Sequence, residues 1–185
     1  MKGAPLARAK QEIYWELLVL RCKRRQEGAF EELVRLWEQR LFYYVRRLVQ
    51  AEEDAWDVLQ QTWLSAFKGI GSLRDPGRLP VWLYRIARNR AISHLRARYA
   101  RQLPIDEESG VAEIEGNDNA GAFDDAEQVH HGLSRLAPGQ REVLTLFFLE
   151  DLTTAEIAEV LAVPLGTVKS RLHHAKRALR DVLER

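Results

Sequence analysis

The chain has 185 residues, of which 46% are hydrophobic and 30% charged, and its formal net charge is +1. This composition excludes disordered and fibrous proteins and predicts one ordinary domain or two small ones. No apolar run approaches the about 20 residues that span a bilayer, and the single cysteine, Cys22, excludes an internal disulfide and a multi-cysteine zinc site. Because no secretory signal pattern is present, we expect a cytoplasmic protein without membrane insertion.

The charges are divided between segments of the chain. Residues 1–102 hold 20 Lys/Arg and 11 Asp/Glu, a net charge of +9, and residues 128–185 have a net charge of +1. Residues 103–127 between them hold 9 Asp/Glu and no Lys/Arg, with several glycines and few large apolar side chains. Such a segment predicts a flexible acidic linker, and the asymmetry indicates nucleic-acid-binding domains on either side.

Apolar side chains at helical spacing predict four helices before the linker, over residues 12–25, 29–49, 53–67 and 81–101. In the first helix we expect Ile13, Leu17, Leu18 and Leu20 to be the apolar residues that pack. Residues 73–80 are interpreted as a loop, because Asp75-Pro76-Gly77 is a strong turn signal. No alternating strand pattern occurs, so we expect an all-α protein.

The fourth helix carries the first candidate binding surface. Seven arginines and no acidic residue lie between positions 78 and 101, and the aromatic residues Trp82, Tyr84 and Tyr99 are interleaved with them. Arginine binds phosphate and aromatic faces stack on unpaired bases, which favours single-stranded DNA. A solvated basic helix with core aromatics fits the same pattern.

Three further helices are predicted after the linker. Residues 138–148 form the first, and the capping box Thr153-Thr154-Ala155-Glu156 begins a short second helix that ends at Leu161. A tight turn at residues 162–164 precedes the last helix, whose apolar stripe consists of Val168, Leu172, Ala175, Leu179 and Val182. This is the helix-turn-helix pattern, in which the second helix enters the major groove of DNA.

The last helix has the residues that such a role needs. Gly166 and Thr167 at its start can bring backbone amides to a phosphate, and Lys169, Ser170 and Arg171 follow at positions that reach base edges or backbone. A helical hairpin with a basic exposed face is the alternative. The absence of acidic residues between Val160 and Arg180 favours DNA binding.

Three stretches resemble bacterial sigma factors of the small extracytoplasmic-function type, within the sigma-70 family. Residues 54–63 (DAWDVLQQTW) are similar to the helix that docks on the clamp of RNA polymerase. Residues 82–89 (WLYRIARN) resemble the helix that reads the minus-ten promoter element, and residues 163–172 (VPLGTVKSRL) resemble the minus-thirty-five recognition helix. The three stretches occur in the order that the family has.

The resemblance implies a fold, a function and partners. It implies a sigma region-2-like domain of four helices at 1–102, a linker at 103–127 and a sigma region-4-like domain at 128–185. The chain would bind the clamp of the largest subunit and the flap of core RNA polymerase, direct it to promoters and promote DNA opening. An anti-sigma protein is a further expected partner.

The resemblance also implies site residues, by position. The polymerase-binding residues would be Asp54, Asp57, Gln60 and Gln61. The minus-ten residues would be Trp82, Arg85, Arg88, Asn89 and Arg96, with a flipped base held near Asn89. The minus-thirty-five residues would be Pro164, Gly166, Thr167, Lys169, Ser170, Arg171, His173 and His174.

The chain departs from the family pattern at three places. Gln61 stands where glutamate is usual, Arg25-Gln26 stands where a Gly-Asp turn is common, and His173-His174 replaces a hydrophobic or arginine pair. The second difference predicts that the first two helices join differently.

Two other functions remain open at this point: a stand-alone helix-turn-helix transcriptional regulator, and a helical module that binds other proteins. An enzyme is disfavoured, because no phosphate loop, nucleophile motif or metal-ligand pattern is found and the five histidines have no suitable neighbours. We therefore expect no catalytic residue, metal or cofactor.

Overall fold

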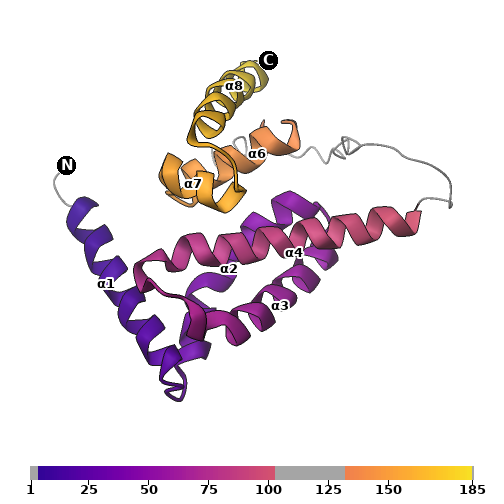
Figure 1. Ribbon diagram of the computed structural model, residues 1–185. Helices are drawn as coiled ribbons and strands as arrows, with labels where there is room; N and C mark the ends of the chain where they lie inside the picture. The colour runs from indigo at the N-terminus through magenta and orange to yellow at the C-terminus, as the bar shows by residue number, and fades with distance from the viewer. Residues whose placement is uncertain (1–3, 103–131, 185) are drawn as a thin grey trace.

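The computed structural model describes residues 4–102 and 132–184, and these residues form helices and turns (Figure 1). The proposed linker at 103–127 lies outside the described residues. The helices of the N-terminal unit are α1 (Ala4–Lys23), α2 (Ala29–Val49), α3 (Glu52–Gly69) and α4 (Leu79–Gln102). The C-terminal unit contains α6 (Pro138–Leu144), α7 (Thr154–Leu161) and α8 (Leu165–Leu183). The all-α prediction with two helical domains is confirmed.

The N-terminal unit is built on α2, α3 and α4, which pack together around one apolar core. Its largest fully buried side chains, Trp37, Tyr44 and Tyr84, form a chain of ring contacts with the half-buried Trp15. The ring centroids are 4.9 Å apart from Trp15 to Trp37, 6.1 Å from Trp37 to Tyr84 and 5.2 Å from Tyr84 to Tyr44. Trp15 belongs to α1, Trp37 and Tyr44 belong to α2, and Tyr84 belongs to α4, so this aromatic chain joins three helices. Helix α4 also contributes Leu83, Ala87 and Ala91 to this core, and all three are fully buried.

Helix α1 packs through a different face from the one that we expected. Ile13, Leu17 and Leu20 are 65%, 56% and 43% exposed, so their assignment to the packed face was wrong, and Leu18 alone of the four is buried. The packed stripe runs instead through Trp15, Leu18, Val19 and Cys22. These positions repeat at intervals of three and four residues, whereas Leu17, Leu18 and Leu20 point in different directions around a helix.

Two connections position the helices of this unit. Arg25 and Gly28 have φ values of 54° and 73°, so the turn between α1 and α2 uses left-handed backbone at two places. The loop predicted at 73–80 was too long: a short 3₁₀ helix, η2, covers Pro76–Arg78, and α4 begins at Leu79. The Asp75 carboxylate accepts from the Gly77 N–H at 3.0 Å, and Pro80 is tolerated because it lies in the first turn of α4.

The C-terminal unit has the predicted helix-turn-helix. The Thr153 hydroxyl accepts from the Glu156 N–H while the Glu156 carboxylate accepts from the Thr153 N–H, which confirms the capping box at the start of α7. Ala162, with φ of 54°, ends α7 and begins the turn. Helix α8 buries Val168, Leu172 and Ala175 against α6 and α7.

Arg141 of α6 holds the start of this unit together. Its guanidinium donates to the carbonyl oxygens of Leu133 at 3.1 Å, Ser134 at 2.9 Å and Leu136 at 3.0 Å. It also donates to the carbonyl oxygen of Arg47 in α2, at 3.3 Å. The side chain therefore fixes the chain that enters α6 and connects it to the N-terminal unit.

The segment after α6 continues as a π-helix, η3 (Thr145–Leu149), and not as the α-helix that we predicted to residue 148. The Glu150 N–H donates to the Thr145 carbonyl five residues earlier, at 3.2 Å. A π-helical turn is rare and is often found at functional positions.

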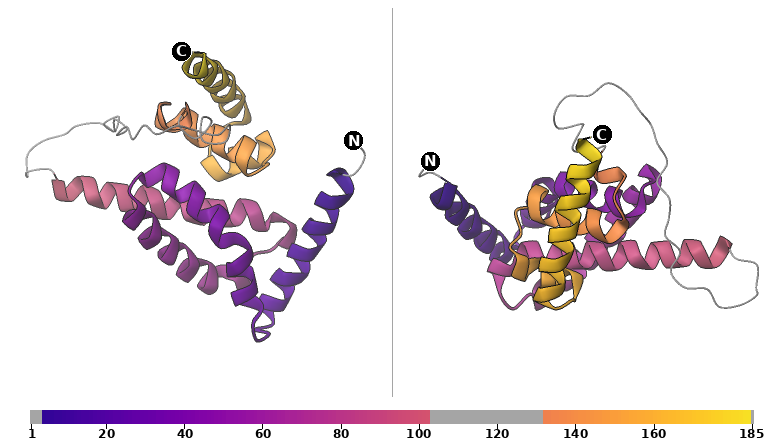
Figure 2. Two further views of the ribbon diagram at one scale, coloured as in Figure 1. Left: turned by 180° about the vertical axis from the view of Figure 1, so that it is seen from behind. Right: turned by 90° about the horizontal axis from the view of Figure 1, so that it is seen from above.

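The two units lie against each other in both views of Figure 2, with α7 over α4 and α6 over α2. No helix in residues 4–102 or 132–184 is long and apolar enough to cross a membrane.

We expect Thr153→Ala to lower the free energy of unfolding by about 1 kcal/mol, because it removes the side-chain half of the capping box. Urea unfolding followed by circular dichroism measures this change. Thr154→Ala, one residue along and outside the cap, is the matched control. Equal midpoints for the two variants would contradict the assigned role of Thr153.

Candidate functional site

A groove between α3 and α4 contains all four residues that the sequence assigned to polymerase binding. It has a volume of 740 Å³, and its α3 side presents Asp54, Asp57, Gln60 and Gln61. The α4 side presents Arg90, Ser93, His94, Ala97 and Arg98, of which the sequence reasoning selected none. The groove therefore offers acidic and amide groups on one side and basic groups on the other.

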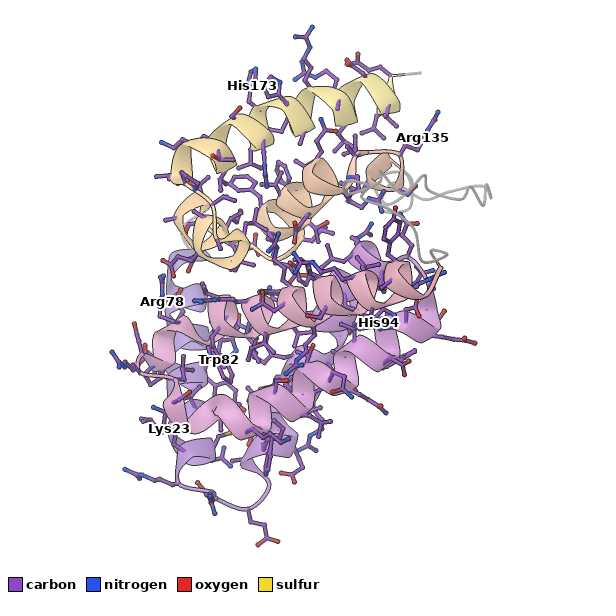
Figure 3. All side chains as sticks on the ribbon, turned by 45° about the vertical axis from the view of Figure 1, so that its right-hand side comes forward. Lys23, Arg78, Trp82, His94, Arg135 and His173 are labelled. Atoms are coloured by element: carbon purple, nitrogen blue, oxygen red, sulfur yellow. The ribbon has the colours of Figure 1, made fainter. Side chains whose placement is uncertain are left out.

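Asp54 is already paired inside this groove. Its carboxylate contacts His94 Nε2 at 3.0 Å and Arg98 Nη1 at 2.5 Å (His94 is labelled in Figure 3). Both partners come from α4, so the ion pairs connect the two helices. Asp57, Gln60 and Gln61 are exposed, and these three side chains are the more accessible part of the site.

Helix α4 presents a second candidate surface. Trp82, Arg85, Asn89 and Arg96 recur at intervals of three, four and seven residues, so they share one helical face. Arg85, Asn89 and Arg96 are exposed, and Trp82 is half-buried with its ring packed near Gly69. The structure thus brings four of the five predicted minus-ten residues together.

Arg88 does not share that face. It precedes Asn89 by one residue, which turns it by about 100° around the helix, and its Nε donates to Glu142 of α6 at 2.9 Å. Tyr84, one of the three aromatic residues expected to stack on bases, is 0% exposed and is also turned toward the C-terminal unit. In this form of the protein neither side chain is open to DNA.

The third candidate surface is the outer side of α8. Lys169, Ser170, His173 and His174 are exposed and Arg171 is half-buried, while the apolar stripe of α8 packs inward. In Figure 3, His173 lies on the side of α8 that faces away from the N-terminal unit. The eight predicted residues therefore lie along α8 or at its N-cap, Pro164.

The start of α8 is open for a ligand to approach its backbone. A Cβ added at Gly166 would meet no atom within 4 Å, and the Thr167 N–H already donates to the Pro164 carbonyl at 2.9 Å. The predicted phosphate contact through Gly166 is thus sterically possible.

Two carboxylates of the C-terminal unit were missed by the sequence reasoning. Glu142 accepts from Tyr44 Oη at 2.9 Å and from Arg88 Nε at 2.9 Å. Glu150 accepts from Arg40 Nε at 3.0 Å and from the Tyr84 hydroxyl. The sequence holds one sign of them: each acid borders the largely apolar run from Val143 to Leu149. An acid at the edge of such a run is close enough to the core to become buried.

Burial changes the pKa values of side chains in this contact between the units. It raises the pKa of the Glu150 carboxyl, while the Tyr84 hydroxyl and the Arg40 charge lower that pKa in part. Burial, with the neighbouring carboxylates, also raises the pKa of Tyr44 and Tyr84 well above the usual tyrosine range. Both hydroxyls therefore remain protonated and available as donors.

No cluster of three or more His, Cys, Asp or Glu side chains that could hold a metal ion occurs in the described part of the chain. His173 and His174 have rings 5.5 Å apart and no such neighbours there.

Comparison with known families assigns both units. The family model described as Sigma-70 region 2 matches residues 33–101, and that described as Sigma-70, region 4 matches residues 126–179. The chain belongs to the sigma-70 family. Region 2 covers the α3–α4 groove and the exposed face of α4, and region 4 covers the helix-turn-helix.

Named relatives agree with this assignment. The chain is 33% identical to the RNA polymerase sigma-H factor of Pseudomonas aeruginosa over 178 residues, which are 90% of this chain and 92% of the relative. It is 36% identical to the ECF RNA polymerase sigma factor SigL of Mycobacterium tuberculosis over 148 residues, which are 78% of this chain and 82% of that one. The resemblance to the extracytoplasmic-function (ECF) type is thereby confirmed.

A solved structure shares the fold of this sigma factor. The sigma factor RpoE of Bartonella quintana, solved in complex with the anti-sigma factor NepR, aligns with a TM-score of 0.69 at 24% identity. The alignment covers 85% of this chain and 98% of RpoE.

We expect Asp54→Asn to change the free energy of unfolding by less than about 1 kcal/mol, because its partners are partly solvated and such ion pairs contribute little. Thermal unfolding measures the effect, with Asp57→Asn as the control on the same helix. A loss of several kcal/mol would mean that Asp54 serves to hold α3 and α4 together.

Proposed function

We propose that this chain binds core RNA polymerase in the cytoplasm and directs it to promoters, where it helps to open the DNA. The observation that carries the proposal is the presence of both sigma regions in one chain, at residues 33–101 and 126–179. The chain itself would carry out no catalysis, because RNA synthesis belongs to the polymerase.

For polymerase binding we propose the groove between α3 and α4. Asp57, Gln60 and Gln61 would contact the clamp directly, with Asp54 beside them. A mixed surface of this kind favours a specific orientation of the partner, because opposite charges must meet and like charges must be kept apart. Residues 128–185 would approach the flap.

For the minus-ten element we propose the exposed face of α4. Arg85 and Arg96 would bind phosphates, and Trp82 and Asn89 would receive a base removed from the opened duplex. Arg88 would take part only after its contact with Glu142 is broken.

For the minus-thirty-five element we propose the outer face of α8. Pro164 and Gly166 allow close approach of a phosphate, and Thr167 adds a hydroxyl beside it. Lys169, Ser170 and Arg171 would contact base edges and backbone, followed by His173 and His174. The domain boundaries 1–102 and 128–185, with a linker at 103–127, remain part of this proposal.

An anti-sigma protein is proposed as a further partner. The RpoE structure described above contains NepR, and another solved neighbour, CnrH, is in complex with the cytosolic domain of CnrY. The stand-alone regulator is not favoured, because it does not account for a region 2 over residues 33–101.

We expect a discrete run-off transcript only when this protein is added to core RNA polymerase from the same organism, on DNA from upstream of its own gene. Asn89→Ala and Arg171→Ala should each lower the amount of transcript by about fivefold or more, since a lost base-edge contact costs about 1–3 kcal/mol. Glu12→Gln, in the middle of α1 and outside the three candidate surfaces, is the control. Tight duplex binding without polymerase, and no transcript, would indicate a stand-alone regulator.

Gly166→Ala separates a DNA contact from a structural role. The added methyl meets open space and alanine favours the helix, so we expect unchanged or slightly higher stability. Binding of the holoenzyme to a minus-thirty-five duplex, measured by fluorescence anisotropy, should nevertheless weaken because the methyl keeps the phosphate away. Unchanged affinity would contradict the proposed approach at Gly166.

A further inference from the structure

The turn between α1 and α2 carries positive charge that none of the three candidate surfaces uses. Arg24 and Arg25 lie at this turn and are exposed. Lys23 precedes them, and its ammonium group donates to the carbonyl oxygen of Leu73. This bond brings Arg74, which is also exposed, to the same end of the N-terminal unit. We call Lys23, Arg24, Arg25 and Arg74 the basic tip.

The charge of the basic tip is largely uncompensated. Within residues 4–102 and 132–184, no carboxylate forms an ion pair with Arg24, Arg25 or Arg74. Of the acids in the same two stretches of chain, Glu27 is exposed and the Asp75 carboxylate accepts a backbone N–H. Exposed arginines without counter-charges attract anions, and their guanidinium groups match the geometry of phosphate oxygens.

The backbone of the turn does not explain why arginine stands at position 25. Its φ of 54° lies in the left-handed region, which glycine and asparagine adopt more easily. Arg25-Gln26 also stands where the family commonly has Gly-Asp. Arginine adds a positive charge there and glutamine removes a negative one, so the turn of this chain is more positive by two charges. What Arg25 supplies is therefore its guanidinium group.

The basic tip is continuous with the proposed minus-ten face of α4. The Trp82 ring packs against Gly69, since a Cβ added at Gly69 would lie 3.2 Å from Cζ2 of the ring. Gly69 precedes a short 3₁₀ helix, η1 (Ile70–Ser72), and Leu73, which accepts from Lys23, follows it. Lys23 and Trp82 lie along the same edge of the unit in Figure 3. A DNA strand whose base is held at Trp82 can therefore continue past η1 to the basic tip.

We propose that the basic tip binds the phosphates of the single-stranded DNA that continues beyond the minus-ten element, on the side of Trp82 that is away from Arg96. Phosphate contacts of this kind position the strand and do not read its sequence. The inference rests on the function proposed above, because that function places the opened strand at Trp82. It adds a contact that depends on how far the strand extends and not on its bases.

The first test measures how strongly binding to this strand depends on salt. Holoenzyme assembled with the full chain is titrated, by fluorescence anisotropy, onto a single-stranded minus-ten oligonucleotide that continues for several nucleotides beyond the element. Arg24→Gln with Arg25→Gln should make the slope of log affinity against log salt concentration shallower by about 1.4, because each neutralised phosphate contributes about 0.7 for single strands. Arg24→Lys with Arg25→Lys keeps both charges and should keep the slope.

Two controls separate a contact at the basic tip from a general loss of charge. Arg135→Gln with Arg180→Gln removes two charges from exposed positions of the C-terminal unit. This pair should leave the slope unchanged, because the oligonucleotide has no minus-thirty-five element. An oligonucleotide that ends at the minus-ten element should bind the parent and the Arg24→Gln, Arg25→Gln variant alike.

Two results of this titration overturn the inference. One is an equal slope for the parent and the Arg24→Gln, Arg25→Gln variant on the longer strand. The other is a difference in slope that is the same on the longer and the shorter strand, which would assign the two arginines to a protein partner.

The second test maps the strand without changing either arginine. In a Cys22→Ala background that still gives the run-off transcript, Glu27→Cys carries an iron chelate that cleaves nearby DNA. In the opened promoter complex we expect cuts in one strand, directly beyond the minus-ten element. An absence of cuts there overturns the inference.

The outcomes distinguish this inference from the proposed function. If the holoenzyme binds the minus-ten sequence no better than a scrambled one, the proposed base contact on α4 fails, and the effects of strand length and salt still decide the basic tip. If the chain does not bind core polymerase, the proposed function fails, and the same titration is made with the full chain alone. An unchanged slope for the Arg24→Gln, Arg25→Gln variant then overturns the inference.

Discussion

The structure depends on the chain of packed aromatic rings in the N-terminal unit. Trp37 contacts Trp15 on one side and Tyr84 on the other, and Tyr84 contacts Tyr44. The aromatic rings are apolar, but the side chains of the two tyrosines end in hydroxyl groups that need hydrogen-bond acceptors when they are buried. The same packing that joins α1, α2 and α4 therefore brings two donors to the surface where the C-terminal unit lies.

The sequence predicted those features of the fold that depend on local pattern. The span of α2 and the capping box at Thr153 were predicted correctly, because helical spacing and a local side-chain bond determine them. The packed face of α1 was not, since a helix with apolar residues on several sides can pack in several ways. Its partners, α2 and the segment around η2, determine which face is buried.

The residues of the candidate sites also fall into those that a local sequence pattern predicts and those that it does not. Residues on one helix face, such as Asn89 and Lys169, can be assigned by their spacing from the packed residues. Glu142, Glu150 and the burial of Tyr84 depend on contacts between residues 54 to 110 positions apart. The spacing of apolar residues along the sequence does not reveal such long-range contacts. An acid at the border of an apolar run was the only local sign of them.

The π-helical turn at Thr145–Leu149 has a consequence for the direction of Glu150. On a regular α-helix, residues 142 and 150 are eight positions apart and point in directions that differ by about 80°. The wider turn changes that angle, and both carboxylates then meet donors on the same neighbouring unit. The length of this short segment is therefore constrained as well as its sequence. Removing one residue would rotate Glu150 away from Arg40 and Tyr84.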